Sequence, residues 1–97
     1  MSATRYPLSM AHIARQACPH FEASSPPATS TARACADCGL ETASNLRLCL
    51  TCGYVGCCES RGAHDTAHYQ ETGHPLITPH GAGPQWLWCY ACQAYLD

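Results

Sequence analysis

The sequence predicts a small α+β domain whose apolar core is too small to stabilise the fold unaided. Three observations support this prediction. Short segments in which apolar and polar residues alternate predict strands. One segment between them is followed by the Gly and Pro that typically end a helix. Leu, Ile, Val and Phe together make up only 12 of the 97 residues. Nine cysteines and six histidines are the remaining candidates for stabilising groups.

Those apolar residues fall below the share that a globular chain usually needs, roughly 20% in these types. Small domains without a sufficient core are stabilised by disulfides or by metal ions. The N-terminus lacks the apolar segment of a signal peptide, and no stretch is long and apolar enough to span a membrane. We therefore expect a cytoplasmic protein, in which the cysteines stay reduced and bind metal.

The charge of the chain argues against nucleic acid as a partner. The net charge is −2, and the five basic residues are all Arg and form no basic patch. Binding to phosphate backbones depends on such a patch. We expect no nucleic-acid partner and no membrane partner, and we expect the single domain to be a monomer.

The N-terminal third of the chain has few structural signals. Residues 1–17 are predicted to form an arm or a short helix, the helix covering Met10–Ala17. Cys18 and His20, in a C-x-H arrangement, can supply two ligands to one metal. Residues 22–34 contain mainly Ser, Thr, Ala and Pro without periodicity, which predicts a loop.

Two C-x-x-C-G units, Cys35–Gly39 and Cys49–Gly53, have the form of zinc knuckles. Two residues between the thiolates let the backbone wrap around a metal and direct N–H groups at the sulfurs. The Gly that follows tolerates the positive φ of this turn. A third pair, Cys89 and Cys92, lacks this Gly, so we expect its turn to differ slightly.

The remaining segments predict short strands around one helix. The strands are expected at 46–48, 54–56 (a strand or a turn), 74–78, 86–89 and 93–96, with a turn at 80–84. The helix is expected at 62–72, because Gly73 follows its last turn and Pro75 lies just beyond. His64 and His68 share one side of this helix and can bind one metal or two adjacent ones.

Twelve residues are candidate metal ligands, enough for three of the closed four-ligand sites that structural zinc prefers. They are Cys18, His20, Cys35, Cys38, Cys49, Cys52, Cys57, His64, His68, His74, Cys89 and Cys92. Each C-x-x-C pair is expected to bind one metal, and the spacing leaves the remaining pairing open. Cys58 is a surplus thiol.

This spacing resembles the zinc finger of the ubiquitin-specific-protease type in its three-zinc form. The matched pattern is C-x-H, two C-x-x-C pairs, C-x(4)-C, C-x(6)-H, H-x(3)-H, H-x(5)-H and a C-x-x-C after a Trp, and it covers residues 18–97. The segments G-H-P-L at 73–76 and W-C-Y-x-C-Q-A-Y at 88–95 strengthen the resemblance. The G-C-C run at 56–58 is similar to stand-alone bacterial members of the family.

The resemblance implies a domain over residues 18–97 in which a small twisted antiparallel sheet, with one or two packed helices, holds three zinc ions. It also implies how the ligands are paired. The implied sets are Cys18, His20, Cys89 and Cys92; Cys35, Cys38, Cys57 and His64; and Cys49, Cys52, His68 and His74. The two helical histidines would then serve different zinc ions.

The resemblance further implies a binding pocket. Three aromatic residues match positions that, in ubiquitin-binding members, surround ubiquitin's C-terminal Gly-Gly tail: Trp88, Tyr90 and Tyr95. Glu59 stands where those members have the Arg that pairs with the tail's carboxylate, and its like charge speaks against ubiquitin as the partner. Arg47, which stands where the family has a Trp, and Arg61 are the candidates for supplying positive charge instead.

We expect a module that is not an enzyme, because closed four-ligand sites leave zinc no open position for a substrate. The favoured function is an interaction module that binds a peptide or a protein C-terminal tail. The alternative is a thiol-based redox or zinc-sensing protein that uses Cys58, because nearby zinc and helix termini would lower the pKa of this thiol.

Overall fold

The computed structural model describes residues 11–21, 27–81 and 85–97. In this part of the chain six strands, one α-helix and two single-turn 3₁₀ helices are present. In chain order they are β1 (His12–Ile13), η3 (Arg15–Ala17), η4 (Ala43–Asn45), β2 (Leu46–Cys49), β3 (Val55–Cys57), α1 (His64–Thr72), β4 (Leu76–Pro79), β5 (Leu87–Cys89) and β6 (Ala94–Leu96).

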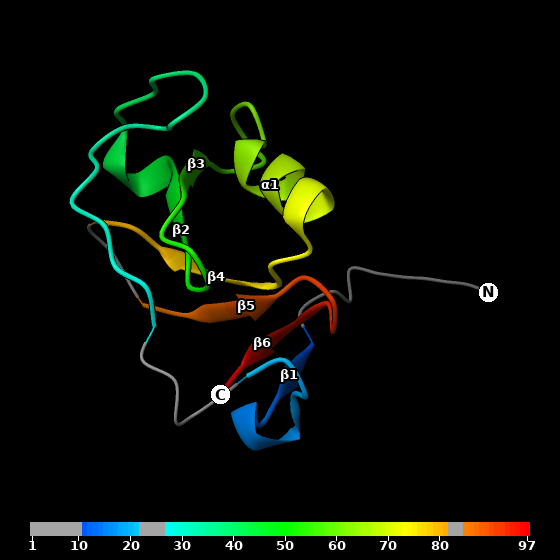
Figure 1. Cartoon of the computed structure of the whole chain (residues 1–97). Coiled ribbons are helices and arrows are strands. Elements are labelled where there is room, and N and C mark those ends of the chain that lie inside the picture. Colours follow the sequence, from blue (N-terminus) through cyan, green and yellow to red (C-terminus); the bar gives the residue numbers. More distant parts are fainter. Residues whose placement is uncertain (1–10, 22–26, 82–84) are drawn as a thin grey trace.

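The six strands form one sheet in the order β1-β6-β5-β4-β2-β3 (Figure 1). The predicted α+β class is confirmed, with a single α-helix beside a sheet. Four of the strand pairs are antiparallel, as the resemblance implied. The pair of β1 and β6 is parallel, so the sheet is mixed.

The parallel pair arises where an arm or a short helix was predicted. Over the described part of 10–17, the chain forms β1 and the turn η3 instead of an α-helix. The reason is the open edge of β6, whose backbone groups need partners. Tyr95 N–H donates to Ala11 O at 2.9 Å, and Asp97 N–H donates to Ile13 O at 2.8 Å. The sheet therefore takes in residues that precede Cys18.

The predicted loop and turn lie partly outside the described residues. Residues 27–34, the described part of the loop expected at 22–34, contain no helix or strand. Residues 82–84, in the turn expected at 80–84, lie outside the described residues. Among the described residues, none of the helices has the length and hydropathy needed to cross a membrane.

One face of the sheet carries the apolar core, which forms two clusters. The first contains Cys35, Leu46, Leu48, Val55 and Cys57, and the second contains Cys18, Leu76, Cys89 and Leu96. Four of these nine buried residues are cysteines that were predicted to bind metal, and Leu48 lies next to another, Cys49. The core therefore includes metal-ligand positions instead of surrounding an independent apolar centre.

The opposite face carries α1 at one end and a row of larger side chains along the rest. Residues directly opposite each other in register point to the same face. Ile77 pairs with Trp88, and Trp88 pairs with Tyr95. The helix packs mainly against β3 and less against β2, at the end of the sheet away from β5 and β6 (Figure 1).

Helix α1 begins two residues later than predicted and ends where predicted. Its first residue follows Ala63, which has a left-handed backbone with φ 57°. Gly73, with φ 77°, ends the helix through a hydrogen bond from its N–H to Tyr69 O at 2.7 Å. No side-chain hydrogen bond caps this start of the helix.

Candidate metal centres and an adjoining cavity

The structure brings the twelve candidate ligands together in three groups of four. Within each group the ligand atoms all lie within 4.8 Å of one another. The first group is Cys18, His20, Cys89 and Cys92; the second is Cys35, Cys38, Cys57 and His64; the third is Cys49, Cys52, His68 and His74. These are the sets that the family resemblance implied.

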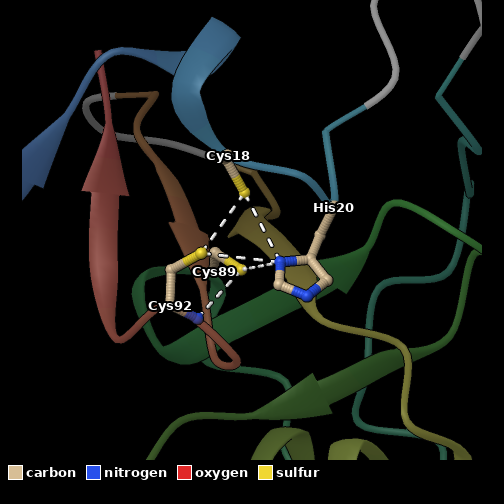
Figure 2. A group of neighbouring side chains, drawn as sticks. All are labelled: Cys18, His20, Cys89 and Cys92. Carbon is tan, nitrogen blue, oxygen red and sulfur yellow. Dashed lines mark hydrogen bonds between the residues drawn. The ribbon is translucent and has the colours of Figure 1, made fainter.

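The first group joins distant parts of the chain (Figure 2). Cys18 follows η3, Cys89 ends β5, and Cys92 lies in the turn that leads to β6. The Cys18 sulfur lies 3.6 Å from the Cys92 sulfur and 3.7 Å from His20 Nδ1. His20 Nδ1 lies 3.5 Å from the sulfurs of both Cys89 and Cys92.

These separations fit the edges of a zinc tetrahedron. Zn–S bonds of about 2.3 Å and Zn–N bonds of about 2.0 Å, at tetrahedral angles, put two sulfurs about 3.8 Å apart and a sulfur and a nitrogen about 3.5 Å apart. A donor set of three thiolates and one imidazole, or two of each, is the set that structural zinc takes. Each group is therefore able to hold one zinc ion, and bound zinc would crosslink the elements that supply the ligands.

The second and third groups share helix α1. In the second, His64 Nδ1 lies 3.1 Å from the Cys57 sulfur, and the sulfurs of Cys38 and Cys57 are 3.9 Å apart. In the third, His68 Nε2 lies 3.4 Å from the Cys52 sulfur. The two helical histidines thus use different ring nitrogens and belong to different groups. Binding of two zinc ions would attach the helix to both knuckles.

Hydrogen bonds favour the thiolate form of Cys35, in the first knuckle, and of Cys18. Burial raises the pKa of the Cys35 thiol, but hydrogen bonds from the backbone of Cys38 and Asp37 outweigh burial and bring the pKa to about 6. Burial likewise raises the pKa of Cys18, and its hydrogen bonds with His20 bring the pKa to about 7. A thiol that ionises readily near neutral pH is suited to binding a metal.

The third knuckle differs slightly from the other two. Gln93 follows Cys92 with φ 53°, and Gly39 and Gly53 follow the first two knuckles with φ 78° and 84°. The third turn therefore differs slightly, as expected: it keeps a left-handed residue after its second Cys, but a non-Gly residue adopts this conformation at a smaller φ.

A cavity of about 650 Å³ lies between α1 and the exposed part of the sheet face. Its described lining residues come from β2, the segment before α1, α1 itself, β4, β5 and β6. They are Arg47, Cys58, Glu59, Ser60, Asp65, Thr66, Tyr69, Gln70, Ile77, Trp86, Trp88, Tyr90, Gln93 and Tyr95. None of the twelve candidate metal ligands is among these described lining residues.

Aromatic rings form the sheet side of this cavity. Tyr95 meets Trp88 edge to face at a centroid distance of 4.9 Å and meets Trp86 in the same way at 5.5 Å. Tyr90 stacks on Tyr69 of the helix at 4.8 Å. Such ring pairs stabilise one another by about 0.5–1.5 kcal/mol beyond their burial. Mutual contacts thus hold the rings of the wall in place.

Acidic groups line the helix side. Glu59 Oε2 accepts a hydrogen bond from Thr66 Oγ1 at 2.8 Å, and Asp65 Oδ1 accepts one from Thr66 N–H at 2.7 Å. Asp65 is 5% exposed. Burial raises the pKa of the Asp65 carboxyl, and hydrogen bonds from the Tyr90 hydroxyl and the Thr66 backbone oppose this rise only in part.

Four of the five predicted partner-binding residues line the cavity. Arg47 and the three predicted aromatic residues do so, whereas Arg61 is not among the described lining residues. Sequence reasoning did not select Trp86, Tyr69 or Asp65 as site residues. The signal for Trp86 was its position two residues before Trp88 in the strand predicted at 86–89, because alternate residues of a strand share one face.

Cys58 lies at the cavity but is enclosed. It is 7% exposed, and its sulfur lies 3.0 Å from Ser60 Oγ and accepts a hydrogen bond from Asn45 Nδ2 at 3.4 Å. Burial raises the pKa of this thiol, and the hydrogen bonds from Ser60 outweigh burial and lower it. All nine cysteines lie in the described part of the chain and are free thiols.

Two relatives are similar to part of this chain. Ubiquitin carboxyl-terminal hydrolase 14 of Schizosaccharomyces pombe is 37% identical over 70 residues, 60% of this chain and 8% of that protein. NAD-dependent deacetylase sir2A of Dictyostelium discoideum is 33% identical over 49 residues, 50% of this chain and 9% of that protein. The chain thus spans less than a tenth of the length of either relative.

A solved structure and a family model match larger parts of the chain. The solution NMR structure of protein RPA1320 from Rhodopseudomonas palustris has a TM-score of 0.68 and 37% identity, and the match covers 82% of this chain and 80% of that one. The family described as "Zn-finger in ubiquitin-hydrolases and other protein" matches residues 35–97. With three ligand groups that fit the three-zinc form, the chain belongs to this family of zinc fingers of ubiquitin hydrolases and other proteins.

Proposed function

We propose that this zinc finger is a docking module that binds an extended peptide or a protein C-terminal tail in the cavity beside α1. The observation that carries the proposal is the cavity of about 650 Å³ with its aromatic wall. Half-buried aromatic rings offer apolar contact to a peptide backbone, and a few polar groups orient it. The cavity has both, with rings on the sheet side and carboxylates and hydroxyls on the helix side.

The zinc-ligand groups support this proposal because they hold both walls. Tyr90 lies between two ligands of the first group, Cys89 and Cys92. Thr66 lies on α1 between the histidines of the second and third groups. A binding site built on rigid elements loses less conformational entropy when it takes up a ligand.

The proposed role is non-catalytic. Each group supplies four ligands, the complete set of a structural zinc site, so no coordination position remains for a substrate. The free thiols suit a reducing compartment, and we place the module in the cytoplasm. We propose that it acts as a monomer.

Ubiquitin is not the partner that the cavity favours. A ubiquitin tail would bring a free carboxylate to the side where Glu59 lies, and like charges at close range repel. We therefore expect ubiquitin to bind this module poorly, whatever partner its relatives have.

The docking proposal is tested by titrating zinc-loaded, ¹⁵N-labelled protein with capped peptides and with ubiquitin. We expect at least one peptide to shift the indole signals of Trp86 and Trp88 together with amide signals of α1. Trp88→Ala should remove these shifts while native mass spectrometry still counts three zinc ions. Tyr54→Phe, a change outside the cavity, is the matched control and should leave binding unchanged. If no peptide shifts these signals, the proposal is wrong.

The alternative, redox or zinc-sensing chemistry at Cys58, has less support. Reactive thiols are partly exposed, and Cys58 is 7% exposed with two hydrogen-bonding neighbours. We expect slow alkylation of Cys58 in the folded, zinc-loaded protein. Rapid alkylation accompanied by zinc release would favour the alternative over docking.

A further inference from the structure

We propose that the cavity recognises the ammonium group of a lysine side chain in the docked peptide, held between Glu59, Asp65 and the aromatic wall. This inference rests on the proposed docking function and adds the chemical class of the ligand. The cavity presents two carboxylates that lack a described cation partner.

The charges around the cavity do not balance. Among the described lining residues, Glu59 and Asp65 are acidic and Arg47 is the one basic residue. The described part of the chain has one ion pair whose nitrogen and oxygen lie within 4 Å of each other. It joins His12 and Asp97, which lie outside the cavity. Neither cavity carboxylate therefore has a described cation within ion-pair distance.

Arg47 cannot easily turn to neutralise them. Its Nη1 donates hydrogen bonds to the backbone carbonyls of Ser44, at 3.2 Å, and Leu46, at 3.0 Å. Its guanidinium carbon lies 5.0 Å from the ring centre of Trp86. These contacts hold the cation at the β2 end, against the aromatic wall. They also show that a ring of this wall can accommodate a positive charge on its face.

The helix side offers acceptors that suit an ammonium group. Glu59 uses Oε2 for its hydrogen bond with Thr66, and Oε1 has no hydrogen-bond partner in the described chain. Thr66 Oγ1 also lies 3.2 Å from the hydroxyl of Tyr90, which joins the acidic side to the aromatic side. An ammonium group has three donors, and Glu59, the Tyr90 hydroxyl and a ring face can satisfy them together.

Lysine fits this arrangement better than the two obvious competitors. A terminal carboxylate would face Glu59 and gain no free cation. An arginine guanidinium is best paired by two free oxygens of one carboxylate in its plane, and one oxygen of Glu59 is already engaged. The compact ammonium group of lysine needs only single acceptors within hydrogen-bond distance of its nitrogen, and these can come from different residues.

The test compares three N-acetylated pentapeptides on the full zinc-loaded chain by calorimetry and NMR. The first is Gly-Gly-Lys-Gly-Gly amide, the second replaces lysine by uncharged norleucine, and the third is pentaglycine with a free carboxylate. We expect the lysine peptide to bind about tenfold more tightly than the norleucine peptide. This is the gain in affinity that one charge-assisted hydrogen bond typically contributes. Its affinity should fall with added salt.

Variants of α1 and the segment before it locate the effect. Glu59→Gln should reduce the affinity for the lysine peptide to that for the norleucine peptide. Glu71→Gln removes the same charge from an exposed position of α1 outside the cavity, and it should change nothing. Glu59→Arg should reverse the preference in favour of the carboxylate peptide. A count of three zinc ions in each variant excludes misfolding.

The outcomes separate this inference from the docking proposal. Equal affinities for the lysine and norleucine peptides, or tighter binding of the carboxylate peptide, would overturn the lysine assignment and leave docking intact. An unchanged Glu59→Gln variant would also overturn it. Failure of all three peptides to shift any cavity signal would remove the docking function as well.

Discussion

Among the described residues, two that are not glycine have a left-handed backbone: Ala63 at φ 57° and Gln93 at φ 53°. This conformation costs an L-residue about 1–2 kcal/mol because its Cβ approaches the following carbonyl oxygen. Both residues lie directly beside metal ligands, since Ala63 precedes His64 and Gln93 follows Cys92. The energy of gathering four ligands exceeds this local cost, so the ligand geometry and not the residue type sets the backbone there.

The strain at Ala63 predicts that Ala63→Gly stabilises the protein. We expect the free energy of unfolding to rise by about 0.5–1 kcal/mol, because relief of the strain exceeds the extra entropy of glycine in the unfolded chain. Thermal unfolding of the zinc-loaded protein measures this. Ala67→Gly, at an exposed position inside α1, is the matched control and should cost about 1 kcal/mol. Equal losses in the two variants would contradict the prediction.

At the scale of elements, Gly56 determines how closely α1 packs on the sheet. A Cβ at this position would lie 2.6 Å from Tyr54 Cε2, 3.0 Å from the backbone N of Asp65 and 3.1 Å from the carbonyl carbon of His64. The last two atoms belong to the helix backbone and cannot rotate away. The close approach of β3 and α1 brings His64 to the cysteines of the second group.

Gly56→Ala should therefore push the first turn of α1 away from β3. We expect a loss of about 1–3 kcal/mol in unfolding free energy and weaker zinc binding at the second group, because overpacking displaces a ligand. Chelator competition and thermal unfolding measure the two effects. Gly73→Ala provides the comparison, because its added Cβ would have no atom within 4 Å and only its φ of 77° is strained. The prediction is wrong if zinc affinity falls no further in Gly56→Ala than in Gly73→Ala.

For the whole molecule, the first ligand group closes the chain. It joins Cys18 and His20 to Cys89 and Cys92, close to where β1 pairs with β6. Zinc in four-ligand sites can contribute about 10–16 kcal/mol of apparent binding free energy in finger peptides. An apolar core as small as this one does not supply a comparable crosslink between the two ends.

Cys89→Ser should loosen both ends of the domain. We expect native mass spectrometry to count two zinc ions instead of three, and limited proteolysis to cleave near β1 and β6. Cys58→Ser, which removes a thiol outside the three groups, should keep three zinc ions and the protease resistance of the parent. Retention of both properties in Cys89→Ser would show that the first group does not hold the fold together.

The amino-acid sequence by itself determined the features that depend on local spacing. The knuckles, the end of α1 at Gly73 and the alternating strands around Trp88 follow from residues close together in the chain. The identity of the twelve candidate ligands was also readable, because few residue types bind zinc and their spacing is distinctive. Spacing alone left open which ligands share a metal, and the family resemblance supplied that pairing.

Only the tertiary structure decided the features that depend on distant partners. Residues 12–13 form a strand and not a helix because the edge of β6, more than 80 positions away, offers them hydrogen bonds. The cavity unites Arg47, Glu59, Asp65 and the aromatic residues of β5 and β6, which no local pattern relates. The cavity has more carboxylates than cations because the fold brings together charged residues that are far apart in sequence. The sequence alone does not show which of these charges become neighbours.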